Sequence, residues 1–125
     1  MPRLKSDIRV AAILRRAQVS GAFAAILRRG DADAGAIWIL TRQGAVLHRH
    51  AEQTGMSGAR EWYRDGPFAD AEMSERVNKA VDRDPDMWVV EIEDVEGRAF
   101  LDGETASPAE PSESEFAARA LFRDR

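Results

Sequence analysis

The sequence predicts an α+β domain in which two helices cover a mostly antiparallel sheet of four to six strands, followed by a disordered linker and a C-terminal docking helix. Two segments have apolar residues at helical spacing, and several short runs rich in β-branched and aromatic residues lie between and after them. A length of 125 residues fits one domain with one core.

The first half of the chain predicts one helix and a run of strands. A helix is expected over residues 4–20, with Gly21 placed where a left-handed helix stop belongs. The run "AFAAILRR" has apolar residues at both parities, which is typical of a central strand covered on both faces. "AIWILTR" and "AVLHRHA" flank a Gln-Gly turn and predict a hairpin over residues 36–51. We expect a loop over residues 52–60, then a short edge strand in "REWYR".

The second half predicts another helix and a second hairpin. Asp70 is expected to cap a helix that ends at the following Asp-Pro pair. The run "MWVVEIED" predicts a strand with Glu91 and Glu93 on the face opposite Trp88, which we expect to be the solvent side. A turn over residues 95–97 then leads into "RAFLD" and closes the hairpin.

The second helix also carries two predicted surface ion pairs. Glu72 lies four residues before Arg76, and Glu75 lies four residues before Lys79. Both pairs have the orientation that favours a salt bridge on a helix surface. This helix shows no residue pattern that indicates catalysis.

The chain divides into three predicted segments. Residues 1–102 are expected to form the single α+β domain, and "GETASPAEPSES" predicts a disordered acidic linker over residues 103–114. Residues 115–125, "EFAARALFRDR", predict a short amphipathic helix that is too short to be stable alone. We expect it to be ordered only when docked on its own domain, on a second copy in a homo-oligomer, or on another protein.

Composition excludes several classes of protein. The chain has no cysteine, which rules out disulfides and thiolate sites and favours a cytoplasmic location. Residues 1–20 contain basic residues and no long apolar block, so neither a signal peptide nor a membrane span is predicted. A net charge of −4 disfavours non-specific binding to nucleic acid. The sequence contains no P-loop and no dinucleotide fingerprint, and we expect no cofactor.

Basic residues near the N-terminus form the first candidate site. Lys5, Arg9 and Arg16 are expected to share one side of the first helix, where they could contact phosphate or an acidic partner. The stretch "LRRGDADAGAIWIL" adds a glycine-rich loop whose arginines could grip an anion and whose aspartates could hold a hard cation. The alternative is a hairpin turn held by its own side chains. The loop residues concerned are Arg28, Arg29, Asp31 and Asp33.

Two histidines form a second candidate site. His48 and His50 lie two residues apart on a predicted strand, so both side chains point to the same face and could share a metal ion. A third ligand would have to come from Glu52, Glu91 or Glu93. The alternative is a pair of histidines on an exposed strand face.

Two motifs carry a resemblance to a known family. The stretches "LRRGDADAGAIWI" and "DPDMWVVEIEDVEGRAFL", separated by a helix, resemble the bacterial proteins grouped as domain of unknown function 1491. The resemblance covers residues 4–101 and implies a self-contained bacterial domain, with no activity or catalytic residue attached to it.

These observations lead to three hypotheses about function. The first is a non-enzymatic binding or adaptor domain that engages a protein or an anionic ligand through the basic helix stripe and the Arg/Asp/Gly loop. The second is a small metal-dependent hydrolase that uses His48 and His50. The third is an RNA-binding module, whose affinity would fall steeply with added salt.

Overall fold

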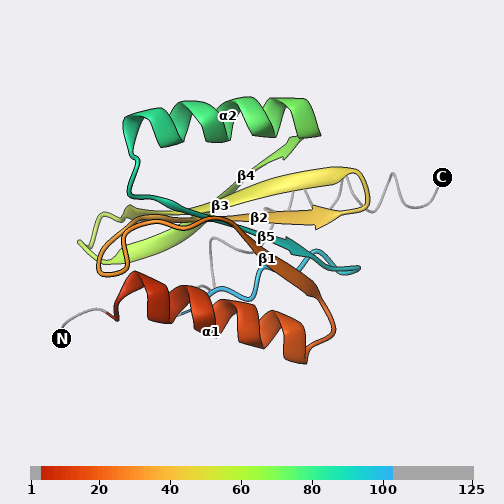
Figure 1. Ribbon diagram of the computed structural model, residues 1–125, viewed down its shortest axis with the longest axis horizontal. Helices are drawn as coiled ribbons and strands as arrows, with labels where there is room; N and C mark the ends of the chain where they lie inside the picture. Colours follow the sequence, from red (N-terminus) through yellow and green to blue (C-terminus); the bar gives the residue numbers. More distant parts are fainter. Residues whose placement is uncertain (1–3, 103–125) are drawn as a thin grey trace.

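The computed structural model describes residues 4–102, in which a five-stranded sheet lies between two helices that cover opposite faces (Figure 1). The linker and C-terminal helix predicted for residues 103–125 lie outside the described residues. The elements in chain order are α1 (Ser6–Val19), β1 (Phe23–Arg28), β2 (Ile37–Gln43), β3 (Val46–Thr54), β4 (Arg60–Phe68), α2 (Asp70–Arg83) and β5 (Trp88–Glu93). Two helices covering one sheet confirm the predicted α+β class.

The sheet is mixed, which corrects the prediction of a mostly antiparallel sheet. Its strand order is β1-β5-β2-β3-β4, and β5 runs parallel to β2 while the other neighbouring pairs are antiparallel. The parallel pair arises because α2 carries the chain back across the sheet before β5 begins, and a helical crossover lets two strands run in the same direction.

The second predicted hairpin is wrong for the same reason. β5 pairs with β1 on one side and with β2 on the other, so neither of its edges is open to a returning strand. Residues 98–102 form no strand. Instead Ala99, Phe100 and Leu101 pack against the apolar cluster on the α1 side of the sheet.

β1 was expected to be a central strand, and it lies at an edge. Its two faces differ: Ala24 and Ile26 pack on the α1-side cluster, whereas the side chains of Phe23 and Leu27 are 65% and 56% exposed. The apolar residues at both parities therefore do not reflect burial on both faces within this chain. β5, inserted between β1 and β2, takes the central position that the sequence pattern suggested for β1.

Each helix covers its own apolar cluster. On the α1 side, Ile13 of the helix packs with residues such as Trp62 and Trp88, all of them 3% exposed or less. On the α2 side, Met73 packs with Leu40 and other buried residues of the sheet. β5 is therefore buried on both faces over most of its length. On the face where the sequence predicted solvent, α2 covers Val89, whereas Glu91 is half-buried and Glu93 is exposed as expected.

The hairpin of β2 and β3 confirms the sequence prediction, with Gly44 at a φ of 63° in its turn. Two boundaries differ. β3 continues to Thr54 into the expected loop, and β4 is a nine-residue edge strand. Asp70 is the first residue of α2, after Ala69, and its carboxylate binds Arg42 of β2 and does not cap the helix. Among residues 4–102, no helix is long and apolar enough to cross a membrane.

Candidate functional site

A cleft of about 340 Å³ lies between α2 and the sheet. Its volume falls within the range of small-molecule sites in proteins. We call it the α2 cleft, and its lining side chains come from β2, β3 and α2. They are Trp38, Arg49, Glu72, Glu75, Arg76, Lys79 and Arg83.

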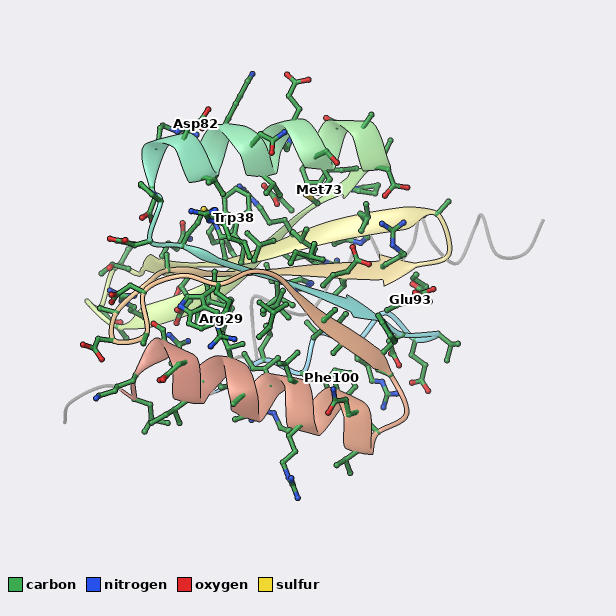
Figure 2. The ribbon with its side chains drawn as sticks, in the orientation of Figure 1. Arg29, Trp38, Met73, Asp82, Glu93 and Phe100 are labelled. Carbon is green, nitrogen blue, oxygen red and sulfur yellow. The ribbon has the colours of Figure 1, made fainter. Side chains whose placement is uncertain are left out.

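Two neighbouring strands provide the floor of the α2 cleft. Trp38 lies on the α2 side of β2, as Figure 2 shows, and Arg49 lies on the next strand. The guanidinium carbon of Arg49 is 4.5 Å from the centroid of the Trp38 ring and 5.6 Å from that of Tyr63. The guanidinium also forms an ion pair with Asp65 of β4. Stacking and pairing together hold this cation in a fixed position beside the indole.

One side of α2 provides the wall. Arg76, Lys79 and Arg83 follow one another at helical spacings of three and four residues, so they project toward the same side. The ion pairs predicted from the sequence are confirmed, since Arg76 lies 3.7 Å from Glu72 and Lys79 lies 3.2 Å from Glu75. Side chains in the second pair are 70% exposed, and such pairs are weak because water screens them.

The charge of the α2 cleft is opposite in sign to that of the whole chain. Four lining side chains are cationic and two are acidic, although the protein carries a net charge of −4. Arg83 has no ion-pair partner among residues 4–102, and the guanidinium of Arg76 lies over the Phe68 ring at 4.4 Å. The cleft therefore combines weakly held cations on α2 with a floor of Trp38 and the firmly held Arg49.

The glycine-rich loop that the sequence singled out caps α1. The backbone amides of Ser6 and Asp7, at the start of that helix, donate to the carbonyl oxygens of Asp33 and Ala32 at 3.3 and 3.0 Å. The Asp31 carboxylate accepts backbone amide bonds from the loop itself, at 3.2 and 2.9 Å. These bonds satisfy helix amides that have no partner within the helix, so the loop has a structural role in the fold.

The basic residues nearest this loop also have partners within the chain. Arg28 donates to the carbonyl oxygen of Pro85 at 2.8 Å. Arg29 lies over the Trp88 ring at 5.3 Å, on the α1 side of the sheet (Figure 2). Lys5 pairs with Asp33 at 3.6 Å, and both side chains are more than half exposed.

Arg9 and Arg16 do not form one surface stripe with Lys5. Arg16 is exposed and donates to the Phe100 carbonyl oxygen at 2.8 Å, whereas Arg9 is only 7% exposed. The Arg9 guanidinium binds Glu52 at 2.9 Å and Asp102 at 2.8 Å. A ligand at this helix would have to displace a buried ion pair. A binding role for Lys5, Arg9, Arg16 and the loop stays a prediction.

Arg9, Glu52, Asp102 and Trp62 form a group that we call the Arg9 cluster. Burial and ion pairing shift the pKa values of Arg9 and Asp102 in opposite directions. Burial lowers the pKa of the Arg9 guanidinium, but its hydrogen bonds to Asp102 and Glu52 raise that pKa by more. Burial raises the pKa of the Asp102 carboxyl, and Arg9 lowers it by more, with help from the indole N–H of Trp62 at 3.2 Å. Arg9 and Asp102 are therefore charged at neutral pH, and the contacts of Arg9 and Asp102 tie α1 to β3, β4 and the end of the described chain.

The two histidines of β3 lie in different environments. His50 is 4% exposed, with its Nε2 atom 3.1 Å from the hydroxyl of Thr41, so the expectation of an exposed strand face is wrong for this residue. Burial, with Arg64 and His48 nearby, lowers the pKa of His50 to about 3. The ring is therefore neutral at physiological pH, and its Nδ1 atom has no hydrogen-bond partner among the described residues.

Two of the proposed third metal ligands already have ion-pair partners, and Glu52 lies on the same strand as the histidines. Glu52 pairs with Arg9, and Glu91 pairs with Arg42 on the α2 side of the sheet. Within residues 4–102 there is no group of three His, Asp or Glu side chains placed to hold a metal ion. The metal site at His48 and His50 stays a prediction.

The sequence did not predict the floor of the α2 cleft, and it did not assign a site to the cations of α2 that line its wall. Trp38 and Arg49 lie on different strands and come together only through the register that places Leu40 opposite Arg49. The spacing of Arg76, Lys79 and Arg83 was visible in the sequence as a cationic side of the second helix. That signal was interpreted only as a set of surface ion pairs.

Comparison with known proteins identifies relatives but no established activity. Residues 4–102 match the family model described as "Protein of unknown function (DUF1491)". No protein with curated functional information matches this chain. Two solved structures of DUF1491 family proteins from Caulobacter crescentus CB15 are similar to it, one from crystallography and one from NMR.

The structural agreement extends over nearly all of each relative. The crystal structure has 40% sequence identity and a TM-score of 0.74, covering 79% of this chain and 95% of that one. The NMR structure has 38% identity and a TM-score of 0.73, covering 83% and 97%. A solution structure of a protein from A. tumefaciens has 30% identity and a TM-score of 0.67, covering 86% and 99%. The chain therefore belongs to the DUF1491 family of proteins of unknown function.

Proposed function

We propose that this protein is a non-enzymatic binding domain that holds a small anionic ligand in the α2 cleft. The observation that carries this proposal is the lining of the cleft, which places four cationic side chains, Trp38 and two carboxylates around about 340 Å³. Anion sites in proteins use such clusters because guanidinium groups match the geometry of phosphate and carboxylate oxygens.

The cations in the wall of the cleft can exchange their ion-pair partners on α2 for an anionic ligand. The Arg76 and Lys79 ion pairs with Glu72 and Glu75 are exposed, so each contributes only a few tenths of a kcal/mol. An entering phosphate or carboxylate replaces these weak pairs, while the carboxylate side chains turn to water. Arg83 adds a cation that no ion pair within residues 4–102 holds.

The floor of the cleft supports orientation of the ligand. Arg49 is held between two aromatic rings and paired with Asp65, so it loses little freedom when a ligand binds beside it. The sequence predicted a binding or adaptor domain for a protein or an anionic ligand. The proposal keeps the anionic ligand and moves its site from the N-terminal stripe and loop to the α2 cleft. At the former positions the cations already have partners within the fold.

Thermal melting tests the proposal directly. The purified full-length chain is melted with inorganic phosphate, pyrophosphate, citrate or AMP, each at matched ionic strength. A ligand at about 100 times its dissociation constant adds roughly 2.7 kcal/mol to the free energy of unfolding. We expect stabilisation by at least one of these anions, and loss of most of it in Lys79→Gln and Arg83→Gln. Arg15→Gln, an exposed arginine on α1 across the sheet, is the matched control and keeps the response.

Other outcomes would contradict the proposal. Stabilisation that persists in both cleft variants would place the anion elsewhere. A response to divalent metal ions that is lost in His48→Ala or His50→Ala would favour the hydrolase hypothesis instead. A response to short RNA that falls steeply with salt would favour RNA binding.

A further inference from the structure

β1 has the composition of a central strand and the position of an edge strand. Its sequence FAAILR contains no proline, and its only charge is at the last residue. The backbone groups on the side away from β5 have no neighbouring strand among residues 4–102. Exposed apolar edges recruit other strands, and proteins normally protect such edges with charges, prolines or covering segments.

The opposite edge of the same sheet has that protection. β4 has the sequence REWYRDGPF, with four charged residues along the strand and Pro67 near its end. Charges and proline on an edge oppose pairing with a further strand. One edge of the sheet is therefore guarded and the other is open, which indicates that β1 has a partner strand in the assembled protein.

We infer that the partner is a second copy of this chain, paired with β1 in antiparallel orientation about a two-fold axis through Ala25. Neighbouring antiparallel strands related by a two-fold axis place residues opposite one another when their numbers have a constant sum. With the axis at Ala25, Phe23 of one copy lies opposite the partner's Leu27, and the same contact occurs twice. These are the two large side chains that β1 leaves more than half exposed.

A groove beside β1 accommodates this contact. It has a volume of about 360 Å³ and lies between the strand and α2, on the face that carries Leu27. Val77 and Val81 of α2 and Val89 of β5 form its apolar part. In the paired arrangement the partner's Phe23 lies beside Leu27 at the mouth of this groove, and its ring is removed from water against these side chains.

The ends of the strands are complementary in charge. The carboxyl end of β1 carries Arg28 and continues to Arg29. The amino end of β1 lies beside the carboxyl end of β5, where Phe23 pairs with the exposed Glu93 and the chain continues to the exposed Glu96. Figure 2 shows Glu93 at that end of the sheet. Antiparallel pairing places the basic end of each copy next to the acidic end of its partner.

Sedimentation velocity of the full-length chain tests the pairing. A six-residue edge makes a small interface, and such interfaces are usually weak, so we expect a dimer that dissociates at roughly 10–100 μM. The mass should rise from 13.9 kDa toward twice that value as concentration increases. Ala25→Lys and Ala25→Glu each place like charges at the axis, and each should weaken the dimer at least about tenfold. An equimolar mixture of the two variants should recover it, because unlike charges then meet.

A cross-link tests the register without a charged substitution. The protein has no cysteine, so Ala25→Cys provides a single thiol. Opposite residues in antiparallel strands have Cα atoms about 4.5–5.5 Å apart, within the range that a disulfide spans. Mild oxidation should therefore produce a covalent dimer of Ala25→Cys and little of Val46→Cys, which has a partly exposed side chain on β3.

Circular dichroism establishes that each variant is folded. A wild-type chain that stays monomeric up to about 1 mM and an Ala25→Cys variant that fails to cross-link would overturn the inference. A dimer that persists in both charged variants would overturn it as well, because it would have to form through another surface. If the chain is monomeric and does not cross-link, the open edge of β1 would instead be a site for a strand of a different protein.

Discussion

At the scale of single residues, His50 links the acidity of the solution to the stability of the fold. The ring is buried against Thr41, and its pKa of about 3 lies below the ordinary value of 6.5. Between these two values the unfolded chain binds a proton that the folded chain does not. Protonation of His50 in the unfolded chain therefore does not reduce the free energy of unfolding above pH 6.5. It reduces that free energy progressively as the pH falls from 6.5 toward the folded-state pKa of about 3.

This linkage gives a measurable slope. We expect the free energy of unfolding, measured with urea, to fall by about 2 kcal/mol between pH 7 and pH 5 because of this group. His50→Gln should abolish most of that fall, and His48→Gln on the same strand should keep it. An unchanged slope in His50→Gln would show that other groups cause the pH dependence. Carboxyl groups with a lowered pKa, such as Asp94 at about 2, reduce the free energy of unfolding only when they become protonated, which occurs at a lower pH than the range from pH 7 to pH 5.

Arg9 is the second residue on which the fold depends. Its guanidinium is the shared counter-charge of Glu52 and Asp102 and lies 5.8 Å from the Trp62 ring centroid. Arg9→Met should lower the free energy of unfolding by about 2–4 kcal/mol, because two largely buried carboxylates lose this counter-charge. Arg15→Met, on the exposed side of the same helix, should change it by about 0.5 kcal/mol or less. Equal effects of the two substitutions in urea unfolding would contradict the role of Arg9.

At the scale of elements, the loop before β2 joins α1 to the start of β5. A methyl group added to Gly30 would lie 2.2 Å from the carbonyl oxygen of Asp86, closer than any real contact. Gly30→Ala should therefore lower the free energy of unfolding by about 2–4 kcal/mol, since the backbone has to move. Asp33→Ala, at an exposed position in the same loop, removes only a weak pair with Lys5 and should change it by about 0.5 kcal/mol. A larger effect of Asp33→Ala than of Gly30→Ala would contradict the close packing of this loop against Asp86.

Which elements were predictable follows from the range of the interactions that specify them. The two helices and the β2–β3 hairpin are specified by nearby residues, such as Gly21 after α1 and Gly44 in the turn. The insertion of β5 between β1 and β2 depends on contacts far apart in the sequence, which local patterns do not encode. The α2 cleft was missed for the same reason, because Trp38 and Arg49 meet only across paired strands.

At the scale of the whole molecule, the two sides of the sheet have different roles. On the α1 side, the glycine-rich loop, the Arg9 cluster and residues 99–101 hold the fold together. On the α2 side, the helix leaves a cationic cleft along one flank and the groove beside β1 along the other. The proposed ligand site and the proposed dimer surface therefore share α2 but use different flanks, so each can be tested while the other is intact.

The central claim is that an anion binds in the α2 cleft, and the indole N–H signals of the three tryptophans test it in one NMR titration. Trp62 and Trp88 donate their indole N–H groups to Asp102 and Asp31 within the fold, whereas Trp38 lies at the cleft. On titration with pyrophosphate at constant ionic strength, the Trp38 signal should shift and saturate while the other two stay in place. A Trp38 signal that does not move, or a saturating shift confined to Trp62 or Trp88, would contradict the account.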